Sequence, residues 1–504
     1  MQSKITTEYG AELKSITKNA SYSAFGIFFM TIMSFVNNIV ITNYLGADLY
    51  GLFILGTNIL GFIVLFPQLG FNNTIVRYVS FYLGKGEKEK AKGTIIYGLK
   101  LLLILSLLVL LISQFLAPTI SESIFNRQEL TPLLRILLLS IPFSVLAIVF
   151  YSSLNGLKLI KYQTISANII NPLVFLLLIA ISFRLNFGLV GLILVMVIIG
   201  VIDSGLSYIF LNKKYFHHNK DVKPKVDKKE LLHFSIPLYF NQFLVNGIRF
   251  VPIFIMGIFL TNKDIGVFNV GFRIAMLVSV SLSAFRLIFS PTISTLFAKD
   301  NKQLINQLYK TITKWIFTIS LITFGIIVLF AEPILNIFGS DFSIGVNVLL
   351  LLIFGELINA AVGLVGNIIV MSGRSKVALF NSCINFVIII VLSYLLIPEY
   401  GIIGAALSYT ITIAFTNIIR LIELYYFEKM HPFKLSYYKP ILVGALVFSI
   451  IYFIKETINL NQNIEMIFGT LAFVLLFISL LWILKIDNED KYIIKVVLKK
   501  IKKK

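Results

Sequence analysis

The stretch FSIPLYFNQFLVNGIRFVPIFIMGIFL, residues 234–260, is followed by the polar turn TNKD at 261–264 and a second apolar run, IGVFNVGFRIAMLVSVSLSAFRLIFS, at 265–290. Each run is long enough to cross a bilayer as a helix, and each carries an arginine far from its ends. Arg249 and Arg273 both lie roughly 14–17 Å from the turn, at about 1.5 Å rise per residue. This depth is close to the midplane of a hydrocarbon core about 30 Å thick.

A guanidinium at the midplane is costly, by at least about 2.5–3.5 kcal/mol on insertion scales. Such a group is expected to face a polar interior, because lipid offers it no partner. We therefore predict that Arg249 and Arg273 mark a cationic cavity for an anionic substrate. The alternative is a structural ion pair, for which Glu356 is available at similar depth in a later apolar run.

The composition of the whole chain is that of a helical membrane protein. Of its 504 residues, 58% are hydrophobic and 13% are charged, and the mean hydropathy is +0.90. A soluble globular domain does not have this composition. The apolar runs predict an all-α membrane protein with about fourteen transmembrane helices. Their approximate limits are 18–44, 49–70, 93–116, 132–155, 162–184, 188–211, 234–260, 264–290, 312–330, 345–371, 376–397, 401–427, 438–458 and 464–484.

The net charge of +20 does not indicate a nucleic-acid partner, because the basic residues are scattered among short loops. Their placement instead predicts orientation. The two tails and one alternate set of loops hold 33 basic residues, and the opposite set holds four. Since positive charge favours the cytoplasmic side, both termini are predicted in the cytoplasm of a cell-membrane protein. The basic stretch at 492–504 is expected to lie on anionic membrane lipids.

Weak internal repeats divide the chain. Gly51 and Gly56 match Gly266 and Gly271 at an offset of 215, and three further matches follow at nearly the same offset. These predict two parallel six-helix bundles, a transporter architecture. The predicted parts are an N-terminal lobe at 1–211, a cytoplasmic linker at 212–233, a C-terminal lobe at 234–430, and two extra helices with a basic tail at 431–504.

Several motifs give the chain a family resemblance. They are YLGADLYGLF at 44–53, LGF at 69–71, VRYV at 76–79, LNGLK at 154–158 and YGIIGAAL at 400–407. With these the chain resembles the polysaccharide transporter branch of the multidrug/oligosaccharidyl-lipid/polysaccharide exporter superfamily, to which O-antigen flippases belong. The motifs concern turns and helix packing, since small residues let helices approach closely.

The resemblance implies a flippase that moves lipid-linked oligosaccharide to the outer leaflet by alternating access. It implies coupling to a proton or sodium gradient, no cofactor, and a monomer that works with glycan-assembly enzymes. The sequence is consistent with transport driven by an ion gradient and not by nucleotide hydrolysis, because it has no GxxxxGKS or GxxxxGKT phosphate-binding loop. We expect no catalytic residue and no metal site.

Two deep carboxylates are candidates for ion coupling. Glu356 and Asp203 lie within apolar runs, where a carboxylate can carry a proton through the transport cycle. Glu356 is equally suited to neutralising an arginine. Asp203 lies nearer the predicted cytoplasmic surface, where water or Lys213 is within reach.

Amides recur within the spans, and three share the depth of the arginines: Asn37, Asn58 and Asn246. Amides can bind the hydroxyls of a sugar, so these three are predicted substrate-binding residues together with the arginines. The alternative is hydrogen bonding between helices, worth about 0.6 kcal/mol per bond on average. By the repeat, Asn58 is the counterpart of Arg273.

The alternatives to this function are other transporters of the same superfamily and membrane enzymes. A lipid II-type flippase is a relative within the same superfamily. A multidrug or cation antiporter also belongs to it but needs an acidic or apolar cavity, whereas the deepest charges here include two arginines. A membrane polymerase or ligase is disfavoured, because its chemistry is expected in a large outer loop, and the longest predicted outer loops, 117–131 and 331–344, are short and lack histidine.

Overall fold

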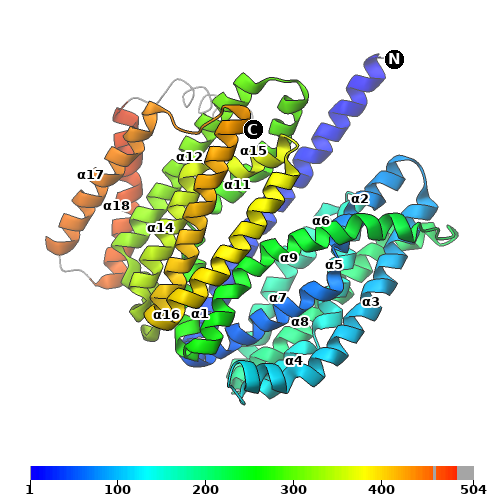
Figure 1. Cartoon of the computed structure of the whole chain (residues 1–504), viewed down its shortest axis with the longest axis horizontal. Helices are drawn as coiled ribbons and strands as arrows, with labels where there is room; N and C mark the ends of the chain where they lie inside the picture. Colours follow the sequence, from blue (N-terminus) through cyan, green and yellow to red (C-terminus); the bar gives the residue numbers. More distant parts are fainter. Residues whose placement is uncertain (1, 458–460, 485–504) are drawn as a thin grey trace. The chain divides into compact units, whose positions relative to one another are not determined.

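The computed structural model describes residues 2–457 and 461–484, and every regular element in those ranges is helical. The predicted all-α fold is thereby confirmed (Figure 1). Contacts divide the chain into two units, Met1–Gly266 and Val267–Lys504. The predicted lobes at 1–211 and 234–430 remain a prediction, and the predicted basic helix at 492–504 lies outside the described residues.

The first unit is built on a long N-terminal helix that is broken once. Gly46 interrupts α1 with φ 73° and ψ 174°, a conformation that favours glycine. The helices of this unit pack mainly through α5 with α8, α2 and α3, and α9 packs on α1 and α2. The elements are α1 (Gln2–Gln68), α2 (Phe71–Gly84), α3 (Lys88–Pro118), η1 (Thr119–Ile124), α4 (Leu130–Leu138), α5 (Ile141–Gly156), α6 (Ile160–Gln163), η2 (Thr164–Ile170), α7 (Asn171–Arg184), α8 (Gly188–Leu211), η3 (Asn212–Phe216), η4 (His217–Asn219), α9 (Lys228–Phe259) and the beginning of α10 (Asn262–Ala275).

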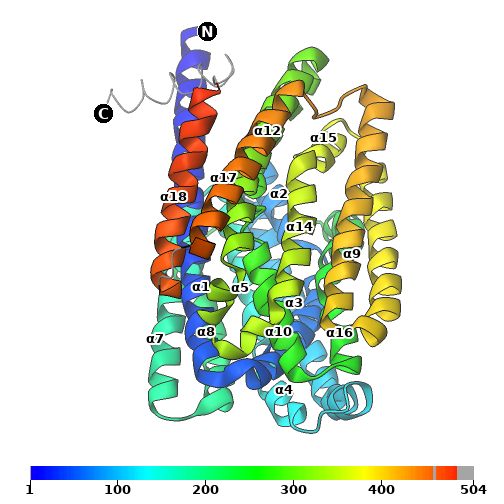
Figure 2. The ribbon, with the colours of Figure 1, turned by 90° about the vertical axis from the view of Figure 1, so that its left-hand side faces the viewer.

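The second unit is centred on α14, which packs on both α16 and α12 (Figure 2). Its longest helix, α16, is interrupted at Gly401, with φ 59° and ψ −135°. The remaining elements are α11 (Val280–Ala298), α12 (Lys302–Leu329), α13 (Ala331–Asn336), η5 (Ser340–Gly345), α14 (Val346–Val362), α15 (Val365–Met371), α16 (Ser375–Glu428), η6 (Leu435–Tyr437), α17 (Tyr438–Thr457) and α18 (Gln462–Ile483).

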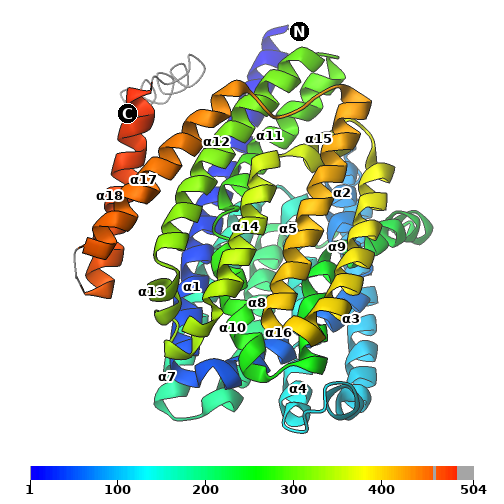
Figure 3. The same cartoon turned by 60° about the vertical axis from the view of Figure 1, so that its left-hand side comes forward.

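The last two described helices lie side by side, and α17 packs on α12 (Figure 3). Glycines permit this close approach. A Cβ at Gly325 would stand 2.5 Å from the Phe473 ring, and one at Gly469 would stand 2.4 Å from the Phe330 ring. Both rings are almost fully buried, so α17 and α18 are firmly attached to the second unit.

By length and composition, the described residues contain eleven helices able to cross a membrane, or twelve if one bent pair is a single span. The predicted number of fourteen is not confirmed. Much of the difference lies in α1 and α16, which are each counted once although each is broken at a glycine. The segments 25–68 and 375–428, with 44 and 54 residues, are long enough for two crossings of about 20 residues each.

Two predicted spans are broken in the structure. The run 264–290 was predicted as one helix, but α10 and α11 are separate and bent by 52° across residues 276–279. The run 345–371 is divided into α14 and α15 at Gly363, whose φ is 66°. The break at residues 276–279 contains neither glycine nor proline, so no helix-breaking residue in the sequence indicates it.

Two of the glycines matched in the predicted repeat, Gly51 and Gly266, lie against each other. A Cβ at Gly51 would stand 1.7 Å from the carbonyl oxygen of Asn262, and one at Gly266 would stand 2.3 Å from that of Ala47. Helix α1 therefore meets the beginning of α10 backbone to backbone. A residue with a Cβ at either position would collide with the backbone of the other helix, so only glycine permits this close approach.

Candidate functional site

Arg249 lies on α9, where apolar and aromatic residues surround it in sequence. Its side chain is exposed, and among the described residues none forms a hydrogen bond or ion pair with its guanidinium. A charged group of this kind on a membrane-spanning helix requires water or an anionic ligand. The function of Arg249 in binding an anion stays a prediction.

Five phenylalanines hold α9 against α1 beside this arginine. The Phe62 ring lies 5.6 Å from that of Phe243, 6.1 Å from that of Phe250 and 5.4 Å from that of Phe254. Phe66 completes the cluster at 5.9 Å from Phe243. Edge-to-face aromatic packing of this kind contributes about 0.5–1.5 kcal/mol per pair beyond area burial. The spacing of phenylalanines along the two helices is the sequence signal for this contact.

The C-terminal end of α9 is also fixed. Arg127 donates one guanidinium hydrogen bond to the carbonyl of Gly257 and another, of 2.7 Å, to that of Leu260. Carbonyls at a helix C-terminus lack partners within the helix, and a cation there satisfies them. Arg127 thus positions α9, a function that sequence reasoning missed because the contact joins segments 130 residues apart.

The three predicted amides bond to backbone carbonyls. Asn58 donates to Ile54 at 2.7 Å, and Asn246 donates to Gln242 at 2.9 Å, each within its own helix. Both are half-buried. Asn37 is buried and donates to the Pro172 carbonyl on α7 at 3.4 Å. This is a hydrogen bond between helices, the predicted alternative to a substrate-binding function. In the described structure its Oδ1 has no hydrogen-bond partner.

Asp203 forms a polar cluster between α8, α5 and η2. The Tyr151 hydroxyl donates to its carboxylate and lies 3.2 Å from the Ser166 hydroxyl oxygen. Lys213, the partner considered from sequence, does not form an ion pair with it among the described residues. The structure thus gives this carboxylate two neighbours that the sequence did not indicate.

Arg273 lies on α10 in the second unit and is half-buried. Its Nε donates to Asn269 Oδ1 at 2.9 Å, one turn earlier on the same helix. This bond sets the plane of the guanidinium. The neighbouring Phe272 ring packs edge-on against Tyr409, with 5.0 Å between centroids. That contact joins α10 to Tyr409 of α16, which also binds the carboxylate of Glu356.

Glu356 is almost fully buried on α14 and is held by donors from two helices. The Tyr409 hydroxyl donates to Oε1 at 2.7 Å, and Asn359 Nδ2 donates to Oε2 at 3.4 Å. Asn417 then donates to Asn359 Oδ1 at 3.2 Å. Buried carboxylates need such partners. In the described structure the partners of Glu356 are these neutral groups, and none is an arginine.

Apart from Asn37, which links α1 to α7, the structure places the candidates in three groups. Asn58, Asn246 and Arg249 lie on the packed pair α1 and α9, and Asp203 belongs to a separate cluster in the same unit. Arg273 and Glu356 lie in the second unit, joined through Phe272 and Tyr409.

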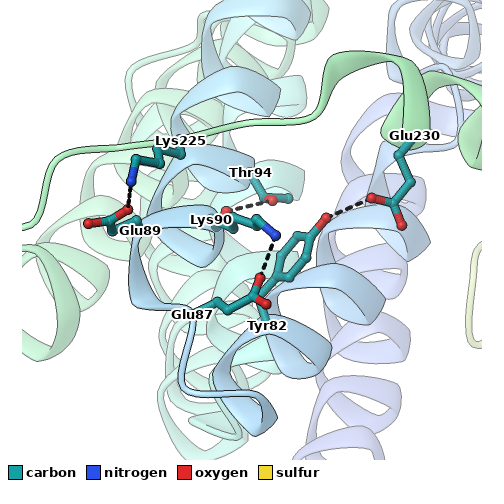
Figure 4. A network of polar contacts seen from close by, with 7 residues as sticks. All are labelled: Tyr82, Glu87, Glu89, Lys90, Thr94, Lys225 and Glu230. Atoms are coloured by element: carbon teal, nitrogen blue, oxygen red, sulfur yellow. Dashed lines mark hydrogen bonds and ion pairs between the residues drawn. The ribbon is translucent and has the colours of Figure 1, made fainter.

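A second polar region lies where the predicted linker meets α3 (Figure 4). Lys225 pairs with Glu89 at 2.5 Å, and Lys90 pairs with Glu87 at 2.7 Å. The Tyr82 hydroxyl donates to Glu230 at 2.9 Å. Burial and the Glu230 carboxylate raise the pKa of Tyr82, so the tyrosine remains the donor. A shallow surface pocket of about 400 Å³ is lined here by Lys90, Lys225, Val226, Asp227, Lys228 and Lys229.

Lys92 anchors the linker on this surface. Its buried ammonium donates to the carbonyls of Asn219, Lys220 and Val222 at 2.7, 3.2 and 2.8 Å. The next residue, Gly93, lies so close to the linker that an added Cβ would stand 1.8 Å from the carbonyl oxygen of Lys225. The linker thus forms a strap fixed to the beginning of α3.

We expect Lys92→Met to release this strap, because the change keeps the apolar stem but leaves three carbonyls without their donor. An unsatisfied buried polar group costs about 1–3 kcal/mol. Limited trypsin digestion should then cut the linker at Lys220 or Lys223 at least roughly tenfold faster. Lys88→Met, an exposed position on the same helix, is the control, and equal cleavage of both variants would contradict the anchoring function.

Long apolar helices that carry charged and hydrogen-bonded groups in their interiors are those of a multi-pass membrane protein. A family model described as "Polysaccharide biosynthesis protein" matches residues 16–297, and one described as "MatE" matches 237–395. The chain belongs to the polysaccharide biosynthesis protein family. The predicted resemblance to the exporter superfamily is confirmed.

Named relatives fit this assignment. The chain is 25% identical over 284 residues to the capsular polysaccharide biosynthesis protein CapF of Staphylococcus aureus, covering 55% of this chain and 69% of CapF. It is 25% identical over 218 residues to the probable low-salt glycan biosynthesis flippase Agl15 of Haloferax volcanii, covering 43% and 46%. The lipid II flippase MurJ, in an inward closed conformation, shares the fold with a TM-score of 0.73 and 16% identity, covering 91% and 97%.

Proposed function

We propose that this protein is a flippase that moves lipid-linked oligosaccharide across the cytoplasmic membrane by alternating access, driven by a proton or sodium gradient. Membership of the polysaccharide biosynthesis family supports the substrate class. The printed name of Agl15 supports the reaction, since that relative is called a glycan biosynthesis flippase. No bond is made or broken in this process, so the protein is a transporter and not an enzyme.

The observation that carries the proposal is the exposed guanidinium of Arg249. It lies on a membrane-spanning helix, and within the described ranges it has no protein partner. A guanidinium forms bidentate, charge-assisted bonds with phosphate oxygens. The diphosphate of a lipid-linked sugar is an anion of the required kind. Arg273, oriented by Asn269, is the second proposed contact.

The other candidates have different proposed functions. Asn58 and Asn246 contact sugar hydroxyls, since an amide retains a donor and an acceptor beyond its helix bond. Asn37 holds α1 to α7 through its bond to the Pro172 carbonyl. Glu356 and Asp203 are the coupling groups. A proton or sodium ion on Glu356 competes with the Tyr409 hydroxyl, and loss of that bond frees α16 from α14 at this point.

One observation favours a second candidate function. The MatE model matches residues 237–395, and this range contains the buried carboxylate of Glu356. A carboxylate within the membrane is the group that an antiporter of cationic compounds requires. A lipid II-type flippase is a further alternative, since the fold is shared with MurJ. Transport assays with the three kinds of substrate distinguish these three functions.

Proteoliposomes containing the purified chain and a fluorescent lipid-diphosphate oligosaccharide should show translocation that an imposed ion gradient accelerates. A gradient of one pH unit supplies about 1.4 kcal/mol per proton, so it should shift the transbilayer ratio about tenfold for one coupled proton. Added ATP should have no effect. We expect Glu356→Gln or Asp203→Asn to remove the gradient response while leaving the protein folded.

A lipid-linked peptidoglycan precursor and a cationic dye serve as comparison substrates in the same liposomes. Transport of the dye in preference to both lipids would transfer the assignment to the antiporter class. Accumulation of the oligosaccharide without any ion gradient would reject secondary coupling.

A further inference from the structure

A row of uncharged polar side chains continues from Arg249 along α9 toward the beginning of the helix. Gln242, Asn246 and Arg249 are spaced by four and three residues, so they lie on one face of the helix. Gln242 and Asn246 are half-buried, and Arg249 is exposed. Residues 231–259 contain no carboxylate and no lysine, and Arg249 is their only arginine. This face of α9 is therefore polar over two turns and carries a permanent charge at one end only.

The first turn of α2 adds a further amide to this face. Gln242 Nε2 donates to Asn72 Oδ1 at 3.0 Å, and this bond joins α9 to α2. Asn72 reaches α9 because Gly70, the residue before α2, lies against the backbone of α9. An added Cβ at Gly70 would stand 2.5 Å from the carbonyl oxygen of Ser235. A side chain at this position would separate the two helices, so Gly70 positions Asn72.

The bond between the two amides leaves part of their hydrogen-bonding capacity unused. A primary amide has one acceptor oxygen and two N–H donors. Asn72 Oδ1 accepts from Gln242 and, at 2.8 Å, from the Asn73 N–H. In the part of the chain that the structure describes, Asn72 Nδ2 has no acceptor and Gln242 Oε1 has no donor. Both side chains are half-buried, so the pair offers a donor and an acceptor to a neutral polar ligand.

Aromatic rings lie beside this row of polar groups. Tyr239 precedes Gln242 by three residues, and its ring lies 6.1 Å from that of Phe243. Among the described residues, the Tyr239 hydroxyl has no hydrogen-bond partner. A sugar has hydroxyl groups around its rim and apolar C–H groups on its faces. Amide and hydroxyl groups next to aromatic rings are therefore suited to bind a sugar.

The spacing along α9 fits a diphosphate followed by a sugar. From Arg249 to Gln242 the helix rises about 10 Å, at about 1.5 Å per residue. A diphosphate and the sugar ring bonded to it together have about this length. Gln242 lies nearer the beginning of α9, which is the end predicted to be cytoplasmic. A diphosphate at Arg249 would therefore place its sugar beside Gln242.

We propose that Asn72, Tyr239 and Gln242 form a subsite for the sugar that is bonded to the diphosphate of the lipid carrier. This inference rests on the proposed function, with the diphosphate on Arg249, and it adds the residues that select the sugar. The alternative is that the bond between Gln242 and Asn72 only holds α9 to α2. A structural bond of that kind would affect the binding of every lipid, whereas a sugar subsite affects only lipids that carry a sugar.

Binding of lipids with and without a sugar distinguishes these two functions. The full chain in phosphatidylcholine nanodiscs is titrated with short-chain polyprenyl diphosphates that carry no sugar, N-acetylglucosamine, N-acetylgalactosamine, glucose or galactose, and Kd is measured by native mass spectrometry. Gln242→Met, Asn72→Leu and Tyr239→Phe nearly preserve the size of each side chain and remove its polar group. Asn241→Leu is the matched control, because Asn241 is a half-buried amide next to Gln242 on a different face of α9.

We expect at least one sugar to bind roughly tenfold or more tightly than the bare diphosphate, because it adds several hydrogen bonds. Gln242→Met and Asn72→Leu should each reduce this gain roughly three- to tenfold and leave the Kd of the bare diphosphate unchanged. Tyr239→Phe should reduce it less. It keeps the packing of the ring, so the test stands if an amide variant does not fold. Asn241→Leu should keep the full gain, and Arg249→Ala should weaken the binding of all the lipids.

Two results would overturn the sugar subsite. One is an equal loss of affinity for bare and sugar-bearing lipids in the amide variants, which is the result expected of a structural bond. The other is a wild-type protein that binds none of the sugar-bearing lipids more tightly than the bare diphosphate. In both cases the proposed function stands if Arg249→Ala weakens binding and the wild type still translocates the lipid-linked oligosaccharide. A wild-type protein that binds none of these lipids would remove both proposals.

Discussion

Arg273→Ala and Arg249→Ala are each expected to abolish export of the glycan in a complementation assay, with the amount of protein in the membrane unchanged. The reason is the loss of a charge-assisted contact with a phosphate. Removing one partner of such a pair costs about 2–5 kcal/mol, which lowers export at least roughly 30-fold. Lysine at either position should restore part of the activity, because it keeps the charge and loses the bidentate geometry.

The control for these variants is Arg135→Ala. Arg135 is an exposed arginine of α4, outside every cluster discussed above. It should export normally. Full export by both Arg273→Ala and Arg249→Ala would remove the cationic-cavity proposal, leaving the flippase assignment supported by family membership alone.

Gly51→Val should prevent formation of the folded protein. The new Cβ would stand 1.7 Å from the carbonyl oxygen of Asn262, which belongs to the backbone and has little freedom to move. Overpacking in a close-packed interior costs about 1–3 kcal/mol, and a backbone collision lies at or above the upper end. Thermal unfolding monitored by size-exclusion chromatography should show a strongly lowered midpoint or no monodisperse protein.

Gly205→Val is the matched control. It lies within a membrane-spanning helix, α8, and an added Cβ there would meet nothing within 4 Å. Its unfolding midpoint should stay near that of the wild type. If Gly51→Val were equally well folded, the contact between α1 and α10 would not be essential to the unit.

Much of the fold could be predicted from the sequence, because a membrane demands long apolar helices and polar turns. The turns at Gly46 and Gly401 lie within motifs quoted above, and both are breaks in the structure. The bend between α10 and α11 could not be predicted. Its residues, MLVS at 276–279, are as apolar as the helices on either side, and packing decides where such a run breaks.

The candidate site, like the fold, could be predicted from the sequence only in part. The depth of Arg249 follows from counting residues, but its exposure depends on which face of α9 packs against α1. The pairing of Glu356 with Tyr409 joins positions 53 residues apart, so spacing along one helix cannot reveal it. The hydrogen-bond partners of the buried polar side chains can therefore be identified only from the three-dimensional structure.

The meeting of Gly51 with the segment that begins at Asn262 has a consequence for which substitutions the chain can accept. Gly51 and Gly266 each lie against the backbone of the other's helix, so a side chain at either position would separate both helices. A change at one of these glycines cannot be offset by a smaller residue at the other, because glycine is already the smallest. The two positions are therefore expected to stay glycine together.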